Sequence, residues 1–185
     1  MLRQLFWHNR AFTFLALSLS FGAVYALNNL LTAPLLLAPG AHLVHLPSGF
    51  KFLLVLVFGS IGALSVFTVS FCAAMGFYFS GNLALSFELA AVNAIGPLLT
   101  RKFFMEHWSL HGNLTNLNWK TLSAMGLMFS VLNSSMNQLV LYWNQVISNM
   151  VDGLQIMLIG DITGVFLVLG FIRLVLLLIK KYTPH

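Results

Sequence analysis

Hydrophobic residues fill long stretches of this chain, and short polar stretches separate them. A helix needs about 20 apolar residues to cross a bilayer, so stretches of this kind predict membrane-spanning helices. We place the helices at residues 11–37, 46–58, 63–79, 83–104, 121–143 and 153–179. The predicted fold class is therefore all-α, a polytopic transmembrane bundle of about six helices.

The composition agrees with a membrane protein. Of the 185 residues, 59% are hydrophobic and 7% are charged, and the mean hydropathy is +0.90. Soluble domains carry about 25% charged residues, so most of this surface cannot face water. We expect one integral membrane domain over residues 1–185, without a soluble output domain. The net charge of +5 is typical of topology signals and lipid headgroup contact rather than of nucleic-acid binding.

Residues 50–79 allow two interpretations, one long tilted helix or two helices joined at the GSIG turn of residues 59–62. Charge decides between them, because with two helices and a cytoplasmic N-terminus only Lys51 lies on the outer side. The residues at or near the cytoplasmic face are then Arg3, Arg10, Arg101, Lys102, Lys120, Arg173, Lys180 and Lys181. The positive-inside rule favours this arrangement, with both termini cytoplasmic in the bacterial inner membrane. The short helix at residues 46–58 would need a thinned bilayer or a protein-shielded path.

Polar residues gather in the outer halves of the predicted helices. Charged groups inside a membrane are expensive and mark functional sites by default; here they are Lys51, Glu88 and Asp161, with Asp152 near the outer surface. One interpretation is an outward-open cavity, in which Lys51 pairs with Glu88 or Asp161, that binds a small ligand or passes an ion or proton. The other is that these groups only join helices by hydrogen bonds. The candidate ligand-binding residues are Lys51, Glu88, Asp161, Asn28, Asn29, Asn137 and Gln138.

The remaining chemistry-bearing residues do not indicate an enzyme, a metal site or a cofactor. His107 and His111 would share a helical face, but Gly112 follows at once, so we expect a solvated pair at the membrane surface. His42 and His45 are expected in a surface segment of an outer loop. Neither a GxSxG nucleophile motif nor a phosphate-binding glycine loop is present.

Glycines in the predicted helices indicate close helix packing. Small residues at i and i+4 let two helix backbones approach each other. The segment GDITG, residues 160–164, has this spacing.

Three segments resemble, in order, parts of the MASE-type (membrane-associated sensor) integral membrane domain of bacteria. LPSG, residues 46–49, is similar to the Pro-x-Gly start of that domain's early helix, and the GSIG turn follows it. NAIGPLLTRKFF, residues 93–104, is similar to the family's Asn-containing helix that ends in basic residues. GDITGVFLVLGFIRL, residues 160–174, resembles the family's last helix. The resemblance implies a sensor domain of helical fold.

Members of that family generally precede a diguanylate cyclase or histidine kinase module, whereas KKYTPH ends this chain. The resemblance thus implies a stand-alone domain whose output is made by another polypeptide. We expect a non-enzymatic inner-membrane sensor or interaction module that contacts membrane lipids, a membrane or cytoplasmic protein partner and a small-molecule ligand, but no nucleic acid. The alternatives are a small-molecule carrier, a substrate-binding membrane subunit, or an accessory scaffold subunit of a larger membrane complex.

Overall fold

Helices make up nearly all of this computed structural model, which describes residues 9–32, 36–38, 41–42 and 44–182. The helices are α2 (Arg10–Thr32), α3 (Leu46–Phe58), α4 (Ser60–Ala73), α5 (Leu83–His107), α6 (Trp119–Trp143) and α7 (Met150–Tyr182). A π-helical segment, η2 (Ala74–Tyr78), continues α4. The strands β1 (Leu36–Ala38) and β2 (Ala41–His42) form a short antiparallel hairpin. The expected helical bundle is confirmed, with this hairpin as an addition.

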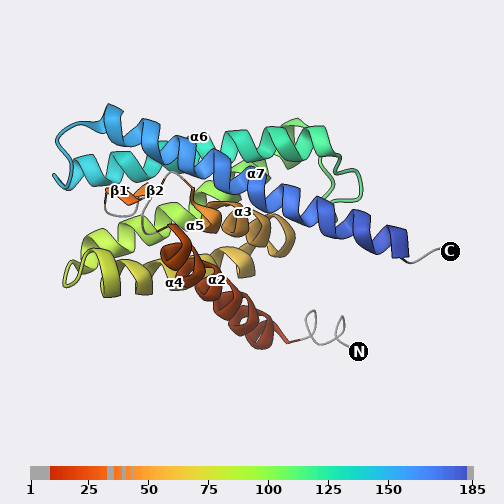
Figure 1. Cartoon of the computed structure of the whole chain (residues 1–185), viewed down its shortest axis with the longest axis horizontal. Helices are drawn as coiled ribbons and strands as arrows, with labels where there is room; N and C mark the ends of the chain where they lie inside the picture. The colour runs from red at the N-terminus through yellow and green to blue at the C-terminus, as the bar shows by residue number, and fades with distance from the viewer. Residues whose placement is uncertain (1–8, 33–35, 39–40, 43, 183–185) are drawn as a thin grey trace.

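The helices run back and forth between two ends of the molecule (Figure 1). The hairpin, the η2–α5 connection and the α6–α7 connection lie at one end, which we call the hairpin end. The α3–α4 turn and the α5–α6 loop lie at the other, which we call the basic end because Arg101, Lys102 and Lys120 belong to it. Helix α2 begins and α7 ends toward the basic end (Figure 1).

Helix α3 is the centre of the bundle and contacts each of the other five α-helices. It has 13 residues, about 20 Å at 1.5 Å per residue, which is short of the roughly 30 Å hydrocarbon core of a bilayer. Its apolar residues are largely buried, and so are Lys51 and Ser48. The path of this short helix is thus shielded by protein.

The break between α3 and α4 falls at Gly59, as the GSIG motif predicted. Gly59 has a φ of +59°, in the left-handed region that only glycine enters readily. A Cβ atom on Gly62 would lie 2.3 Å from the carbonyl oxygen of Leu54, so the first turn of α4 packs on the backbone of α3. Two helices, rather than one long helix, therefore fill this part of the chain.

Four helical segments in the described part of the chain are long and apolar enough to cross a membrane: Arg10–Thr32, Ser60–Tyr78, Leu83–His107 and Gly153–Ile179. This finding supports a membrane protein. Helix α6 has 25 residues but carries several amides and is not among the four. Membrane crossing by α3 and α6 stays a prediction.

The first helix ends earlier than predicted. It spans Arg10–Thr32, whereas we expected a segment that continues to Leu37 with interruptions at Asn28, Asn29 and Pro34. Pro34 follows in the sequence, and the residue before a proline disfavours the helical conformation. Leu36–Ala38, which we had placed in the helix, forms β1.

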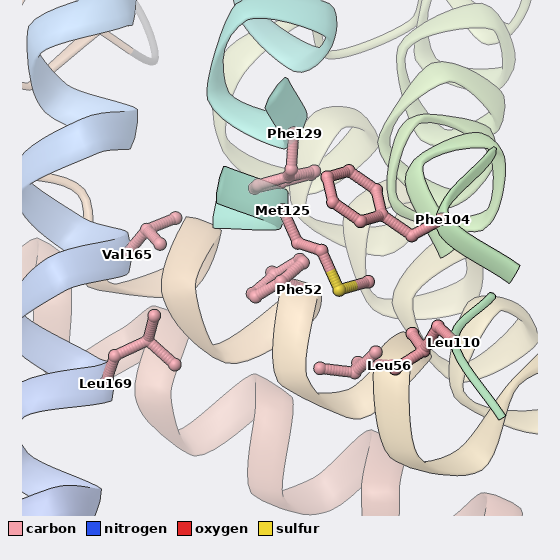
Figure 2. Packing of buried hydrophobic residues seen from close by; sticks show 8 residues of the cluster. All are labelled: Phe52, Leu56, Phe104, Leu110, Met125, Phe129, Val165 and Leu169. Atoms are coloured by element: carbon pink, nitrogen blue, oxygen red, sulfur yellow. The ribbon is translucent and has the colours of Figure 1, made fainter. Parts of the chain in front are cut away.

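A cluster of fully buried apolar side chains occupies the half of the bundle toward the basic end. It comprises Phe52, Leu56, Phe104, Leu110, Met125, Phe129, Val165 and Leu169, and we call it the core cluster (Figure 2). The rings of Phe52 and Phe129 stack with centroids 5.4 Å apart. Figure 2 shows these side chains converging from α3, α5, α6 and α7 and, for Leu110, from the loop after α5.

Candidate functional site

Asp161 of α7 is the centre of a buried hydrogen-bond network, and 4% of its surface is exposed. Its Oδ1 accepts a hydrogen bond from the Ser48 hydroxyl and lies 3.5 Å from His45 Nδ1. Its Oδ2 accepts from Asn133 Nδ2 at 2.6 Å and from the Ser134 hydroxyl at 2.9 Å. Hydrogen bonds of this number and kind stabilise a charged carboxylate in a buried place.

Two glycines bring the start of α3 against the backbone of α7, which places Ser48 beside Asp161. A Cβ on Gly164 would lie 1.9 Å from the carbonyl oxygen of His45, and a Cβ on Gly49 would lie 2.4 Å from that of Gly164. The amide of His45 donates to the carbonyl oxygen of Gly160 at 3.2 Å. The expected close-packing role of GDITG is confirmed at Gly164.

Lys51 lies one turn further along α3 and is 2% exposed. Its ammonium donates to Asn93 Oδ1 at 2.5 Å and lies 5.7 Å from the centre of the Phe129 ring. Its charge also attracts the Asp161 carboxylate. Within the described residues Asn93 is its one hydrogen-bond acceptor, although an ammonium group has three donors.

A partly open cavity of about 70 Å³ lies between these side chains. Its walls include Tyr25, His45, Lys51, Tyr78, Asn93, Asn133, Asn137 and Asp161. One water molecule needs roughly 10–15 Å³ of such space, so the cavity has room for a few waters or for one small polar group. We call it the polar cavity.

One wall of the polar cavity carries an unsatisfied acceptor. Asn133 is 2% exposed, and its Oδ1 has no hydrogen-bond partner among the described residues. A buried acceptor without a donor costs about 1–3 kcal/mol. This atom has almost no accessible surface and lies beside Gly96 of α5, so the unused hydrogen-bonding capacity of the polar cavity comes from the spare donors of Lys51.

Three of the predicted ligand-binding residues line the polar cavity together: Lys51, Asp161 and Asn137. Asn137 Nδ2 donates to Asn93 Oδ1 at 3.3 Å and to the carbonyl oxygen of Asn133 at 2.8 Å. Lys51 and Asp161 line the same cavity, but they form no ion pair within 4.0 Å among the described residues, and the hydrogen bond of Lys51 goes to Asn93.

Asn28 and Asn29 border this region but are not among its lining residues. Asn28 is buried, and its Oδ1 accepts from the backbone amide of Leu46 at 2.9 Å. It therefore satisfies a free amide at the start of α3, which is a structural role. Asn29 Oδ1 accepts from the Tyr78 hydroxyl at 3.1 Å and so joins α2 to η2.

Glu88 and Gln138 do not face the polar cavity. Glu88 is exposed and accepts from Asn144 Nδ2 at 2.7 Å, so the predicted Lys51–Glu88 pair is wrong. The reason is helical: Glu88 precedes Asn93 by five residues, which turns it about 140° away around α5. Gln138 Nε2 lies 2.7 Å from Met157 Sδ, and its buried Oε1 has no partner in the described part of the chain.

The sequence did not indicate the full set of Asp161 partners. His45, which we expected in a surface segment, is half-buried against Asp161 and Ser48. Pro47 was a usable signal, because proline is common in the first turn of a helix and therefore indicates that α3 begins here. His45 directly precedes this start, so its side chain lies at the same end of α3 as Ser48. The side chains of His42 and Asp152 lie outside the described residues.

Serine, histidine and aspartate meet here in an order unlike that of a hydrolase triad. In a triad the serine hydroxyl donates to histidine, which in turn donates to the carboxylate. Here the Ser48 hydroxyl donates directly to Asp161, and His45 Nδ1 lies 2.7 Å from Ser48 Oγ. No group of three metal-ligating His, Cys, Asp or Glu side chains occurs in the part of the chain that the structure describes. The arrangement is suited to binding by hydrogen bonds and charge.

Comparisons with protein-family models, with curated proteins and with solved structures find no match for this chain. The resemblance to the MASE-type domain therefore stays a prediction.

Proposed function

We propose that this chain is a non-enzymatic sensor domain of the bacterial inner membrane that binds a small polar group in the polar cavity and signals through a partner protein. The observation that carries the proposal is the unused hydrogen-bonding capacity of the buried Lys51 ammonium there. Lys51 is 2% exposed, yet it has donors without partners among the described residues. Buried polar groups usually have their hydrogen bonds satisfied, and Lys51 is the charged group that lines the polar cavity with donors to spare, whereas the unpaired atoms of Ser18, Ser86 and Gln138 lie outside it.

The core cluster favours a sensor over a carrier. Phe129 lies under the Lys51 ammonium, and Phe52 stacks on Phe129. The cluster continues toward the basic end through side chains that are all at most 4% exposed (Figure 2). A carrier or ion path needs polar groups on both sides of the binding site, so a dead-end pocket fits receptor function better.

Helix α7 supplies a route from the polar cavity to a partner. Asp161 lies on it, and Phe171–Ile179 at its other end is exposed on every side. A ligand that changes the Asp161 network acts through its differential affinity for two positions of α7. The exposed segment would transmit that shift to a membrane or cytoplasmic protein.

We place the basic end in the cytoplasm, in agreement with the positive-inside rule. There Arg101 donates to the carbonyl oxygens of Leu56 at 3.1 Å and of Gly112 at 3.3 Å. Arg173 lies 5.0 Å from the centre of the Trp119 ring. Cations and a tryptophan at one level are typical of a headgroup region.

Native mass spectrometry of the protein, extracted gently from its own membrane, tests the proposal. We expect a bound small-molecule mass in the wild type that Lys51→Met and Asp161→Asn lose. Glu88→Gln is the matched control, because Glu88 is a carboxylate outside the polar cavity, and it should keep the mass. A stoichiometric protein partner without any small molecule, unchanged in all three variants, would instead indicate an accessory scaffold subunit.

A further inference from the structure

An apolar groove of about 450 Å³ runs along the outside of the bundle between α2 and α4. Its lining residues are Gly22, Tyr25, Ala26, Asn29, Leu30, Val69, Cys72, Ala73 and Phe77. Several of these residues are small, and a Cβ on Gly22 would meet no atom within 4 Å. Both helices belong to the segments able to span a membrane, so hydrocarbon chains can reach this groove.

The groove and the polar cavity share a wall. Tyr25 lines both spaces. On η2, Tyr78 lines the polar cavity while its neighbour Phe77 lines the groove. The Tyr78 hydroxyl bonds to Asn29 of the groove, and its ring lies 6.4 Å from that of Tyr25. π-Helical segments of this kind often occur at functional sites.

The two spaces differ in the ligand chemistry that they accept. The polar cavity is small and lined by amides and charges, so it suits a head of a few atoms. The groove is lined mainly by apolar side chains and suits an alkyl chain. Asp161 already accepts hydrogen bonds at both oxygens, whereas Lys51 has spare donors, so the head should carry acceptor oxygens.

We propose that the ligand is a single-chain amphiphile with a carboxylate head. The head binds Lys51 in the polar cavity, and the alkyl chain passes Tyr25 and lies in the groove between α2 and α4. The ligand thus enters from the bilayer, in the plane of the membrane, past Tyr25 and Tyr78, which separate the groove from the polar cavity. This inference rests on the proposed function and specifies its ligand class.

Cys72 provides a direct test, because it is the single cysteine of the chain, is exposed and lines the groove. The full chain is placed in phosphatidylcholine nanodiscs, and its alkylation by a maleimide is followed with and without hexadecanoic acid. We expect hexadecanoic acid to slow alkylation of Cys72 at least about fivefold. Hexadecyltrimethylammonium, with the same chain and a head that has no acceptor oxygen, should leave the rate within about twofold, because it cannot accept a hydrogen bond from Lys51. Equal protection by both probes, or by neither, overturns the proposal.

Two variants separate this inference from the proposed function. Lys51→Met removes the head contact and should abolish protection by hexadecanoic acid. Gly22→Leu fills the groove without touching the polar cavity and should abolish it as well. If Gly22→Leu keeps the natively bound small molecule and wild-type protection, the amphiphile is wrong while the sensor stands. If neither the wild type nor the variant carries a bound small molecule and neither is protected, both proposals are wrong.

Discussion

The polar cavity and the core cluster share helices α3, α5, α6 and α7, yet their buried groups are satisfied to different degrees. Lys51 and Phe52 are neighbours on α3 and are 2% and 1% exposed. Phe52 stacks on Phe129, so its contacts are complete. Lys51 has one hydrogen-bond acceptor among the described residues. One half of the bundle is thus filled by close apolar packing, while the other contains a buried ammonium with donors to spare, as the proposed ligand site requires.

The largest effect is expected from a substitution that breaks the close backbone contact between α3 and α7, two helices that the polar cavity and the core cluster share. Gly164→Ala would place a Cβ 1.9 Å from the His45 carbonyl oxygen, and backbone there cannot move without shifting α3. We expect the free energy of unfolding to fall by more than about 4 kcal/mol, measured by chemical unfolding in detergent. Gly170→Ala is the matched control on α7, since its Cβ would meet nothing within 4 Å, and equal losses would contradict the account.

A second prediction concerns the core cluster alone. Phe104 is 1% exposed, and Phe104→Ala should lower the free energy of unfolding by about 3 kcal/mol through the cavity that it creates. Bound small-molecule mass should persist in the folded fraction. The neighbouring Phe103 is 37% exposed, so Phe103→Ala should lose clearly less stability. Loss of the bound mass in the folded Phe104 variant would remove the distinction between the two halves.

A third prediction concerns the carboxylate of the polar cavity. Asp161→Asn keeps the shape but removes the charge that Ser48, Asn133 and Ser134 stabilise. Loss of charged hydrogen bonds should lower stability by about 2 kcal/mol, with retained folding and membrane insertion. The small-molecule mass and the response of the partner should both be lost. An unchanged response in a folded variant would count against the pocket.

The smallest effect is expected at Glu88, a carboxylate of the hairpin end that lies outside the polar cavity. Glu88 is exposed and bonds only to Asn144 among the described residues. Glu88→Gln should change the unfolding free energy by less than about 0.5 kcal/mol and leave ligand retention unchanged. A loss of ligand in this variant would move the binding site away from the polar cavity.

Patterns along the chain predicted the architecture better than they predicted the site. The break at Gly59 could be predicted from the turn motif and from the charge distribution. A turn motif depends only on neighbouring residues, and the charge distribution is an average over many residues, so neither requires knowledge of distant contacts. Glu88 was misplaced because burial depends on which way a helix faces, and the polar and apolar residues of α5 do not separate onto opposite faces, so its sequence gives little signal of the buried side. His45 was missed because its partner Asp161 is distant in sequence and is reached only through the close α3–α7 contact.

The hairpin of β1 and β2 shows a further limit of hydrophobic pattern. Leu36–Ala38 is apolar and continues the preceding helical stretch in sequence, so hydrophobicity alone does not separate strand from helix in so short a run. Pro34 was the available signal, and it predicts that the helix is interrupted without distinguishing a strand from a loop after it.

Lys51→Met, measured by variable-temperature native mass spectrometry, tests the central claim most directly because it reports bound ligand and unfolding together. Methionine fills similar space but removes the charge that offsets that of the buried Asp161 carboxylate, and the loss of one partner of a buried charge pair lowers stability. We therefore expect loss of the bound small molecule together with an unfolding temperature below that of the wild type. Retention of the bound molecule at that lower unfolding temperature would show that Lys51 joins helices and that the polar cavity is not a ligand site.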